Sequence, residues 1–341
     1  MLLPSSVETL STTFPTTFTW KYEHQDGQLT RLYDHAKRDQ WDGATTLDWT
    51  RAVDPEAENL PDSQIAIYGT PIWDRLTTPE RERLRHESMS WILSQFLHGE
   101  QGALLATAQL VDAVPVMDAK LYAATQVMDE ARHVEVYDRY LRDKLEKVYP
   151  INPHLKTLLD QILSDSRWDM KYLGMQILVE GLALAAFGFI RAYANEPLIR
   201  DLTTHVMRNE ARHVAFGVIS LRDFYATHFT AAEVRERQEF TYEACVLMRD
   251  RFLARDVWER MGMPADECCG YALASPSMIE FRRMLFSKIV PNVKKLGLLD
   301  DWLRERFHGL GILQYEDLEA SDDAVLAAEP PATAAQATAA S

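Results

Sequence analysis

Cysteine is scarce in this 341-residue sequence, which contains only Cys245, Cys268 and Cys269. An odd number that includes an adjacent pair is not the pattern of a disulfide-stabilised domain. The sequence also has no Cys-x-x-Cys pair of the kind that holds a structural zinc ion. The shortage of cysteine therefore predicts a protein of a reducing, cytoplasmic compartment.

Basic residues are few as well, with 36 Lys and Arg against 51 Asp and Glu, which gives a formal net charge of −15 at pH 7. Six of the acidic residues follow Tyr315, and no Lys or Arg does. Binding to nucleic acid or to an anionic membrane needs a basic surface. We therefore expect neither a nucleic-acid partner nor a membrane partner.

Long apolar runs are absent. The most apolar stretch, residues 173–190, contains Gln176 and Glu180, and a membrane span does not readily carry a glutamate at its centre. The first residues, MLLPSSVETLSTTF, lack a basic segment followed by an apolar one, so we do not predict a signal peptide.

No segment alternates apolar and polar residues with a period of two, so the sequence predicts an all-α protein. Proline, glycine and capping residues mark the helix ends, with starts at Thr78-Pro79 and at Thr230 followed by Glu233. Long helices are predicted over 78–113, 118–148, 166–194, 197–229 and 231–261, and shorter ones near 276–295 and 299–307. We expect an irregular N-terminal segment, 1–75, packed on a helical domain, 76–315, and a disordered acidic and Ala/Pro-rich tail, 316–341.

The pentapeptide Glu-Ala-Arg-His-Val occurs twice, beginning at Glu130 and at Glu210. Another glutamate lies thirty residues before each copy, namely Glu100 and Glu180. A single shift of 80 residues therefore relates the two sets. We interpret them as two similar helical hairpins, each of which supplies one lone Glu and one Glu-x-x-His.

The spacing brings these side chains together. Residues three apart share one face of a helix, so Glu130 and His133 aim at one point, as do Glu210 and His213. Thirty residues allow the chain to run along one helix and return along its neighbour. Four ionised glutamates cannot share an apolar interior unless cations neutralise them, and oxygen and imidazole ligands suit iron or manganese. The alternative is a decayed duplication whose side chains form only a polar network.

With these residues the sequence resembles the ferritin-like di-iron carboxylate proteins, whose bundle pattern has two Glu and two Glu-x-x-His motifs. Residues 129–133, Asp-Glu-Ala-Arg-His, match the D-E-x-R-H of the branch that contains ribonucleotide-reductase small subunits, bacterial monooxygenase hydroxylases and aminobenzoate N-oxygenases. The resemblance covers about residues 80–230. It implies a ferritin-like four-helix bundle with additional helices, which holds two Fe ions or a Mn/Fe pair. The implied metal ligands are Glu100, Glu130, His133, Glu180, Glu210 and His213.

The resemblance also implies roles for residues beside the ligands. Asp129 is expected to hydrogen-bond a ligand histidine, and Asn209, which stands where the branch usually has Asp, can accept a hydrogen bond without bringing a charge. Arg132 and Arg212 are expected to pair with nearby acids. The alternative for each arginine is an ordinary position on the helix surface.

At three positions, the residue in this chain can be compared with the residue that particular members of the branch have there. Tyr137 stands where reductase small subunits carry a radical tyrosine, with a core tyrosine as the alternative. Leu184 stands where hydroxylases often have Thr. Val206 stands where aminobenzoate N-oxygenases have a further histidine ligand, and the neighbouring His205 is a candidate ligand only if the helix is distorted there.

We therefore predict an O₂-activating di-iron oxygenase that hydroxylates or N-oxygenates a small or medium organic substrate, with O₂ as co-substrate. Electrons are expected from an external donor protein, because the sequence has no flavin or iron–sulfur motif, and a homodimer is expected from the branch. The alternatives are a radical-generating subunit that uses Tyr137 and an iron-handling ferroxidase. Candidate cavity residues, with core packing as the alternative for each, are Phe96, Ala103, Leu104, Ile177, Ala183, Leu184, Phe187 and Phe216.

Overall fold

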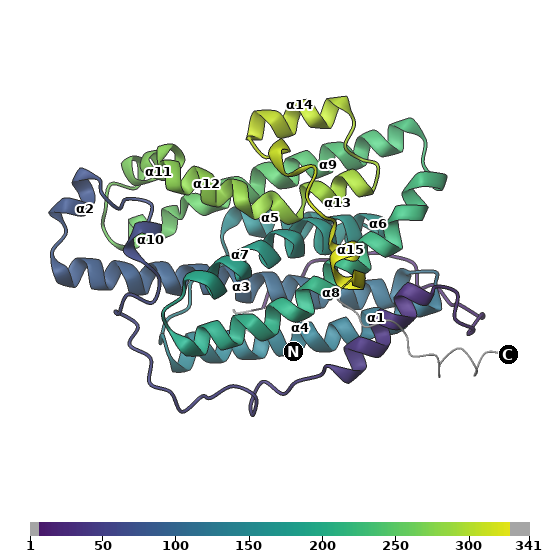
Figure 1. Ribbon diagram of the computed structural model, residues 1–341, viewed down its shortest axis with the longest axis horizontal. Coiled ribbons are helices and arrows are strands. Elements are labelled where there is room, and N and C mark those ends of the chain that lie inside the picture. The colour runs from purple at the N-terminus through teal and green to yellow at the C-terminus, as the bar shows by residue number, and fades with distance from the viewer. Residues whose placement is uncertain (1–6, 328–341) are drawn as a thin grey trace.

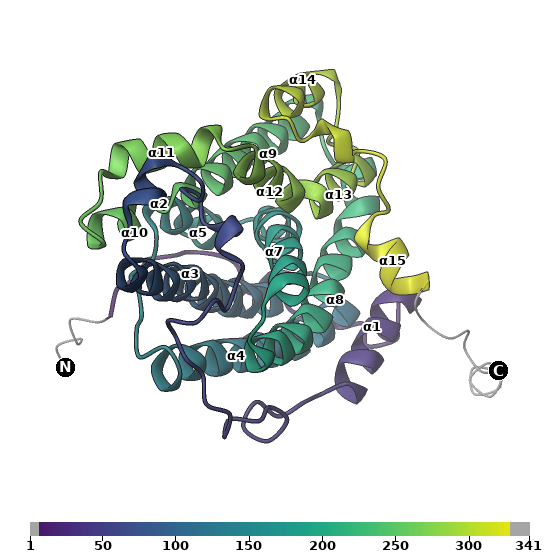
Figure 2. The same cartoon turned by 60° about the vertical axis from the view of Figure 1, so that its left-hand side comes forward.

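Four long helical segments form an antiparallel bundle in the computed structural model, which describes residues 7–327 (Figures 1 and 2). No strand occurs among these residues, and the prediction of an all-α, ferritin-like bundle is confirmed. The bundle consists of α3 (Thr78–Ala113), α4 (Met117–Asp143), the continuous stretch α6 (Trp168–Tyr172), η2 (Leu173–Val179) and α7 (Glu180–Tyr193), and α8 (Pro197–His228).

Local capping fixes the ends of the bundle helices. The backbone N–H of Thr77 donates to the Glu80 carboxylate at 2.8 Å, so the N-cap of α3 is Thr77, one residue before the predicted cap at Thr78. Helix α4 ends at Asp143, five residues before the predicted end at 148. The chain turns at Glu146, whose φ is +51°, so this left-handed residue ends the helix region well before Pro150 is reached.

The third bundle segment is not a uniform α-helix. Its central part, Leu173–Val179, is a π-helix, which has one extra residue per turn, and it ends immediately before Glu180. The stretch Trp168–Tyr193 is long and apolar enough to span a membrane, with a mean hydropathy of 1.8 in its most apolar window. That window is 83% buried inside the protein, as expected for a core helix, so the hydropathy is weak evidence for a membrane span.

Shorter helices cover one side of the bundle (Figure 2). The predicted helix 231–261 is interrupted, because α9 ends at Asp250, a 3₁₀ turn follows over Arg251–Leu253, and Ala254 has a φ of +48°. The predicted helix 276–295 is likewise two helices, and α11 was not predicted. The outer helices are α5 (Pro153–Ser164), α9 (Ala231–Asp250), α10 (Arg255–Arg260), α11 (Ala265–Ala274), α12 (Pro276–Leu285), α13 (Val290–Lys295) and α14 (Asp301–Leu310).

The N-terminal segment is less irregular than predicted. It contains the amphipathic helix α1 (Gly27–Arg38), the single-turn helix α2 (Pro71–Arg75) and a 3₁₀ turn over Asp62–Gln64. Helix α1 packs on α4 and α8 through one apolar side (Figure 1). The buried residues of that side are Leu29, Leu32 and Ala36.

The acidic tail was also expected to be disordered, but its described part contains helix α15 (Ser321–Ala327), which lies against α8. The Ser321 backbone N–H donates to the side-chain oxygen of Asn292 at 2.9 Å, which anchors the start of this helix. The remainder of the tail, 328–341, lies outside the described residues.

A close approach between α8 and the π-helix gives a test of the packing. A Cβ added at Gly217 would lie 2.7 Å from Cβ of Gln176, whereas one added at Gly188 in α7 would meet no atom within 4 Å. Both substitutions to alanine gain similar helix propensity. We expect Gly217→Ala to be less stable than Gly188→Ala by about 1–3 kcal/mol in urea unfolding. Equal stabilities would show that the two segments are not packed this closely.

Candidate metal centre

The bundle brings all six predicted metal ligands into one buried site. Glu100 comes from α3, Glu130 and His133 come from α4, Glu180 is the first residue of α7, and Glu210 and His213 come from α8. None of the six side chains is more than 6% exposed.

The six residues form two overlapping groups, each of which has the geometry to hold a metal ion. In both groups one ligand atom from every residue lies within 4.8 Å of the others. We call them the His133 cluster, made of Glu100, Glu130, His133 and Glu210, and the His213 cluster, made of Glu130, Glu180 and His213. Glu130 belongs to both, so its carboxylate is placed to bridge two ions.

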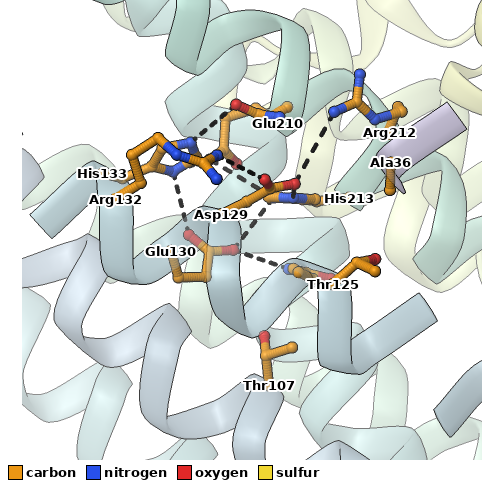
Figure 3. A network of polar contacts seen from close by, with 12 residues as sticks. Ala36, Thr107, Thr125, Asp129, Glu130, Arg132, His133, Glu210, Arg212 and His213 are labelled. Atoms are coloured by element: carbon orange, nitrogen blue, oxygen red, sulfur yellow. Dashed lines mark hydrogen bonds and ion pairs between the residues drawn. The ribbon is translucent and has the colours of Figure 1, made fainter. Parts of the chain in front are cut away.

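Both histidines present the same ring nitrogen to the carboxylates (Figure 3). Nδ1 of His133 lies 3.1 Å from Glu100, 3.2 Å from Glu130 and 3.0 Å from Glu210. Nδ1 of His213 lies 3.1 Å from Glu130 and 3.6 Å from Glu210. Glu210 therefore approaches both imidazoles, although only the His133 cluster includes it.

Despite these short distances, several buried atoms that face this interior form no hydrogen bond of good geometry in the described chain. They are Oε2 of Glu130, Oε2 of Glu180, both carboxylate oxygens of Glu210 and Nδ1 of His213. Buried polar atoms are almost always satisfied, so a concentration of free acceptors of this kind fits a site for positively charged species. Divalent cations fit the donor set, because carboxylate oxygen and imidazole nitrogen together suit iron or manganese.

The electrostatics of the site point the same way. Burial raises the pKa of Glu100 to about 8, and burial together with the neighbouring carboxylates raises the pKa of Glu180 well above its usual value. Burial alone favours neutral imidazole, but the carboxylates raise the pKa of both His133 and His213 far above their usual range. The interior thus attracts positive charge, and metal ions would displace the protons held there.

The outward nitrogens of the two histidines are held by the residues predicted for that role, in a crossed arrangement. Nε2 of His213, on α8, lies 3.3 Å from Asp129 of α4, and Nε2 of His133, on α4, lies 3.3 Å from Asn209 of α8. Each motif thus orients the histidine of the other, and one partner is charged while the other is neutral.

Both arginines of the repeated pentapeptide are buried, contrary to the surface alternative. Arg132 donates to Asp129 at 2.9 Å, and Arg212 lies 3.9 Å from the same carboxylate. Burial raises the pKa of Asp129, but the hydrogen bond with His213 and the nearby positive charges outweigh this effect and hold the pKa below its usual value. Asp129 therefore stays ionised and accepts the His213 N–H.

Gln40 and Trp41, from the N-terminal segment, hydrogen-bond the residues that hold the two histidines. The sequence did not reveal either of them. The Trp41 indole N–H donates to the side-chain oxygen of Asn209 at 2.8 Å, and Gln40 accepts from Arg132 at 2.5 Å. An indole N–H only donates, so the atom that it contacts is the amide oxygen. His133 must then donate its own Nε2–H to that oxygen, which leaves the lone pair of Nδ1 free for a metal ion.

Gln126 is another residue of the site that the sequence did not reveal. Its side-chain N–H₂ donates to Glu130 and to Glu180, both at 2.9 Å. It lies one helical turn before Glu130, so its helical spacing was the available signal. The shift of 80 residues places Val206 at the matching position of the second motif, and that valine is fully buried.

His205 does not join either cluster. It is half-buried, and its ring lies 5.0 Å from the ring of Trp41. Helix α8 is regular at this point, so the distortion that would bring His205 inward is absent. Tyr137 is fully buried beside the site, with its ring 5.9 Å from Phe96 and 6.1 Å from Phe187.

A small cavity of about 20 Å³ adjoins the clusters, and three of its wall residues are Glu100, Glu180 and Glu210. Four of the eight predicted cavity residues line it: Phe96, Ala103, Ala183 and Phe187. The other four, Leu104, Ile177, Leu184 and Phe216, are absent from its wall. Leu184 lines a separate groove, and Phe216 packs on Tyr122 with ring centres 4.5 Å apart.

The sequence matches the family described as p-aminobenzoate N-oxygenase AurF over residues 23–297, which is most of the chain. The chain belongs to the AurF family. The family is one of ferritin-like di-iron proteins, and membership identifies the chain as an oxidase or oxygenase of the di-iron type. The predicted superfamily is thereby confirmed.

Among solved structures, this AurF-family chain is similar to an R2-like ligand-binding oxidase in several metal-loaded states. A variant with an anaerobically reconstituted Mn/Fe cofactor is 16% identical, with a TM-score of 0.48, and the match covers 81% of this chain and 94% of that one. The oxidase with an aerobically reconstituted cofactor after photoconversion is 17% identical, with a TM-score of 0.42 and coverages of 88% and 95%. No curated protein sequence matches the chain.

The overlap of the two clusters predicts how many ions each glutamate helps to hold. Protein titrated with Mn(II) should bind two ions per chain. Glu180→Gln should lose one, because the His133 cluster stays complete, whereas Glu130→Gln should weaken both sites. Glu135→Gln, on the exposed side of the same helix, is the matched control. Equal losses for Glu180→Gln and Glu130→Gln would contradict the bridging position of Glu130.

The contact between Trp41 and Asn209 predicts a remote effect on metal affinity. Trp41→Phe removes the N–H that holds Asn209, so His133 is less well oriented and the affinity of its cluster should fall by about tenfold or more. Trp49→Phe is the control, because it loses a similar indole bond, to the Gly43 carbonyl at 2.7 Å, away from the site. Similar Mn(II) affinities for the two variants would exclude a role of Trp41 in positioning the ligand.

Proposed function

We propose that this protein is an O₂-activating oxygenase that uses two iron ions to oxidise a small or medium organic substrate, with electrons from an external donor protein. The observation that carries the proposal is the pair of overlapping clusters with an apolar cavity against them. A storage or transport role for iron does not require an apolar lining beside the ions, whereas activation of O₂ next to an organic group benefits from one.

The residues of the chain have separable tasks in this proposal. Glu100, Glu130, His133 and Glu210 would hold one ion, and Glu130, Glu180 and His213 would hold the other. Gln126 ties Glu130 to Glu180 and limits the movement of both carboxylates. The bound iron ions would supply the reductive activation of O₂.

The cavity walls restrict what reaches the ions. Phe96, Ala103, Ala183 and Phe187 give it an apolar lining, and its volume of about 20 Å³ is room for one or two water-sized molecules. A lining of this kind excludes bulk water from the reacting group and so prevents side reactions of a strong oxidant with water. The reaction types we propose are hydroxylation and amine N-oxygenation, and the description of the matched family supports the second.

A tyrosyl-radical function is less well supported by the surroundings of Tyr137. Burial raises the pKa of its phenol far above the usual value, and Glu100 and Glu210 add to this effect. No carboxylate among the described residues lies within hydrogen-bond distance of the hydroxyl to accept its proton. We therefore propose that Tyr137 packs behind the cavity residues Phe96 and Phe187 and does not form a radical.

One experiment separates these functions. Protein loaded with Fe(II) without O₂ and then exposed to O₂ and an electron donor should incorporate oxygen from ¹⁸O₂ into an arylamine or hydrocarbon probe. Tyr137→Phe should keep most of this incorporation, and EPR spectra should show no tyrosyl radical in either protein. Loss of the reaction together with a radical signal that depends on Tyr137 would favour the radical subunit. Formation of ferric mineral without any organic product would favour a ferroxidase.

A further inference from the structure

A second and larger cavity, which we call the outer chamber, lies where α10 packs on α3 (Figure 1). Its volume is about 120 Å³, and its walls come from residues 57–66, from α3, α7, α10 and α12, and from the turn after α9. No metal ligand lines it. Many of its wall residues are large, apolar and buried, among them Met89, Phe252, Val257 and Trp258.

The interior of the outer chamber carries no unbalanced charge. Among the described residues, Arg85 is the only charged residue of its wall, and its guanidinium donates to the two carboxylate oxygens of Asp62 at 2.7 and 2.8 Å. The polar wall residues Asn59, Gln64 and Ser88 are uncharged. Apolar cavities of about this size stay dry and take up apolar molecules such as xenon. Since a void also costs the packing contacts of its wall atoms, its presence in a well-packed interior favours a function.

Helix α3 connects the outer chamber with the cavity of about 20 Å³ beside the clusters, which we call the metal-site cavity. Ser88 and Ile92 line the outer chamber, and Phe96 and Glu100 line the metal-site cavity. These four residues are spaced four apart, so each lies one helical turn above the one before it. The step from Ile92 to Phe96, and so from one cavity wall to the other, is about 6 Å along the helix axis.

The turn after α9 makes the same connection on the other side. Arg251 lines the metal-site cavity, and the next residue, Phe252, lines the outer chamber. Arg251 is only 6% exposed, it pairs with no acidic residue among residues 7–327, and its Nε–H has no hydrogen-bond partner there. The two cavities are therefore neighbours of opposite character, because charged groups line the inner one and the outer one is apolar.

We propose that the outer chamber is an O₂-binding site that supplies the metal centre, and that O₂ crosses from it to the metal-site cavity past Ile92 and Phe252. The inference rests on the proposed function for the use of O₂ at the ions, whereas binding of an apolar gas in the chamber does not depend on that function.

The sizes of the two cavities favour O₂ over an organic molecule as the occupant. The metal-site cavity has room for only one or two water-sized molecules. A diatomic gas fits both spaces and crosses between them with small movements of side chains. An organic molecule held in the outer chamber would have to displace the packed residues Ile92 and Phe252 in order to reach the ions.

Xenon, an apolar gas with strong anomalous scattering, tests the binding site without turnover. Crystals of the native protein under xenon pressure should show xenon in the outer chamber. Ser88→Phe places a ring in the chamber and should abolish this peak, and the smaller Ser88→Leu should weaken it. Ala274→Phe adds the same ring at an exposed position of α11 outside the wall and should keep the peak.

The reaction of the Fe(II)-loaded protein with O₂ tests the route. The rate of iron oxidation is measured by stopped-flow absorbance at several O₂ concentrations, without any organic substrate. Ser88→Phe should lower the second-order rate constant several-fold, Ser88→Leu should lower it less, and Ala274→Phe should match the native protein. The iron content of all samples should be equal, because Ser88 lies about 18 Å from Glu100 along the axis of α3.

Several results would overturn the proposal. One is a native chamber that takes up no xenon, or that holds an organic molecule instead. Another is a Ser88→Phe protein that loses the xenon peak but oxidises iron as fast as the native protein, since O₂ would then reach the ions by another route. Slower oxidation with the xenon peak intact would also contradict it. If Ser88→Phe does not fold, Ser88→Leu and Ala66→Leu, which also fills the chamber, decide by the same two measurements. Failure of the oxygenase function would leave both measurements unaffected, because neither uses an organic substrate.

Discussion

The accumulation of negative charge in a dry interior is the constraint on which this structure depends. Four glutamates with exposures of 6% or less gather around two imidazoles, and several of their oxygens accept no hydrogen bond in the described chain. Such an interior is stable only when cations or protons neutralise it. Side chains more than a hundred residues apart in the sequence meet at this site because the long bundle helices, with their caps and the covering helix α1, bring them together.

The two halves of the repeat share a plan but have diverged in ways that matter chemically. Asp129 gives His213 an anionic partner, whereas Asn209 gives His133 a neutral one that Trp41 holds in place. Gln126 restrains two carboxylates, while buried Val206 stands at the matching position. Two ions held here would therefore have unequal surroundings, and the unpaired Arg251 adds a further asymmetry on the cavity side.

The sequence predicted the parts that depend on short, regular spacings. Glu130 and His133 share a helix face at a separation of three, and the exact shift of 80 residues carried Glu100, Glu130 and His133 onto their counterparts. Trp41 and Arg251 carry no motif and reach the site only through tertiary packing, so no local pattern reveals them. Ile177 does not line the cavity, and it belongs to the π-helix, where the ideal spacing from Glu180 no longer applies.

Crystals of the Fe(II)-loaded protein, measured with anomalous scattering at the iron edge, test the central claim most directly. The account predicts two iron peaks about 3.5–4 Å apart, as in other two-metal sites, lying between Glu130 and Glu210 with a histidine Nδ1 bound to each. A single peak, peaks on the protein surface, or an interior in which the six side chains contact only one another and water would contradict it.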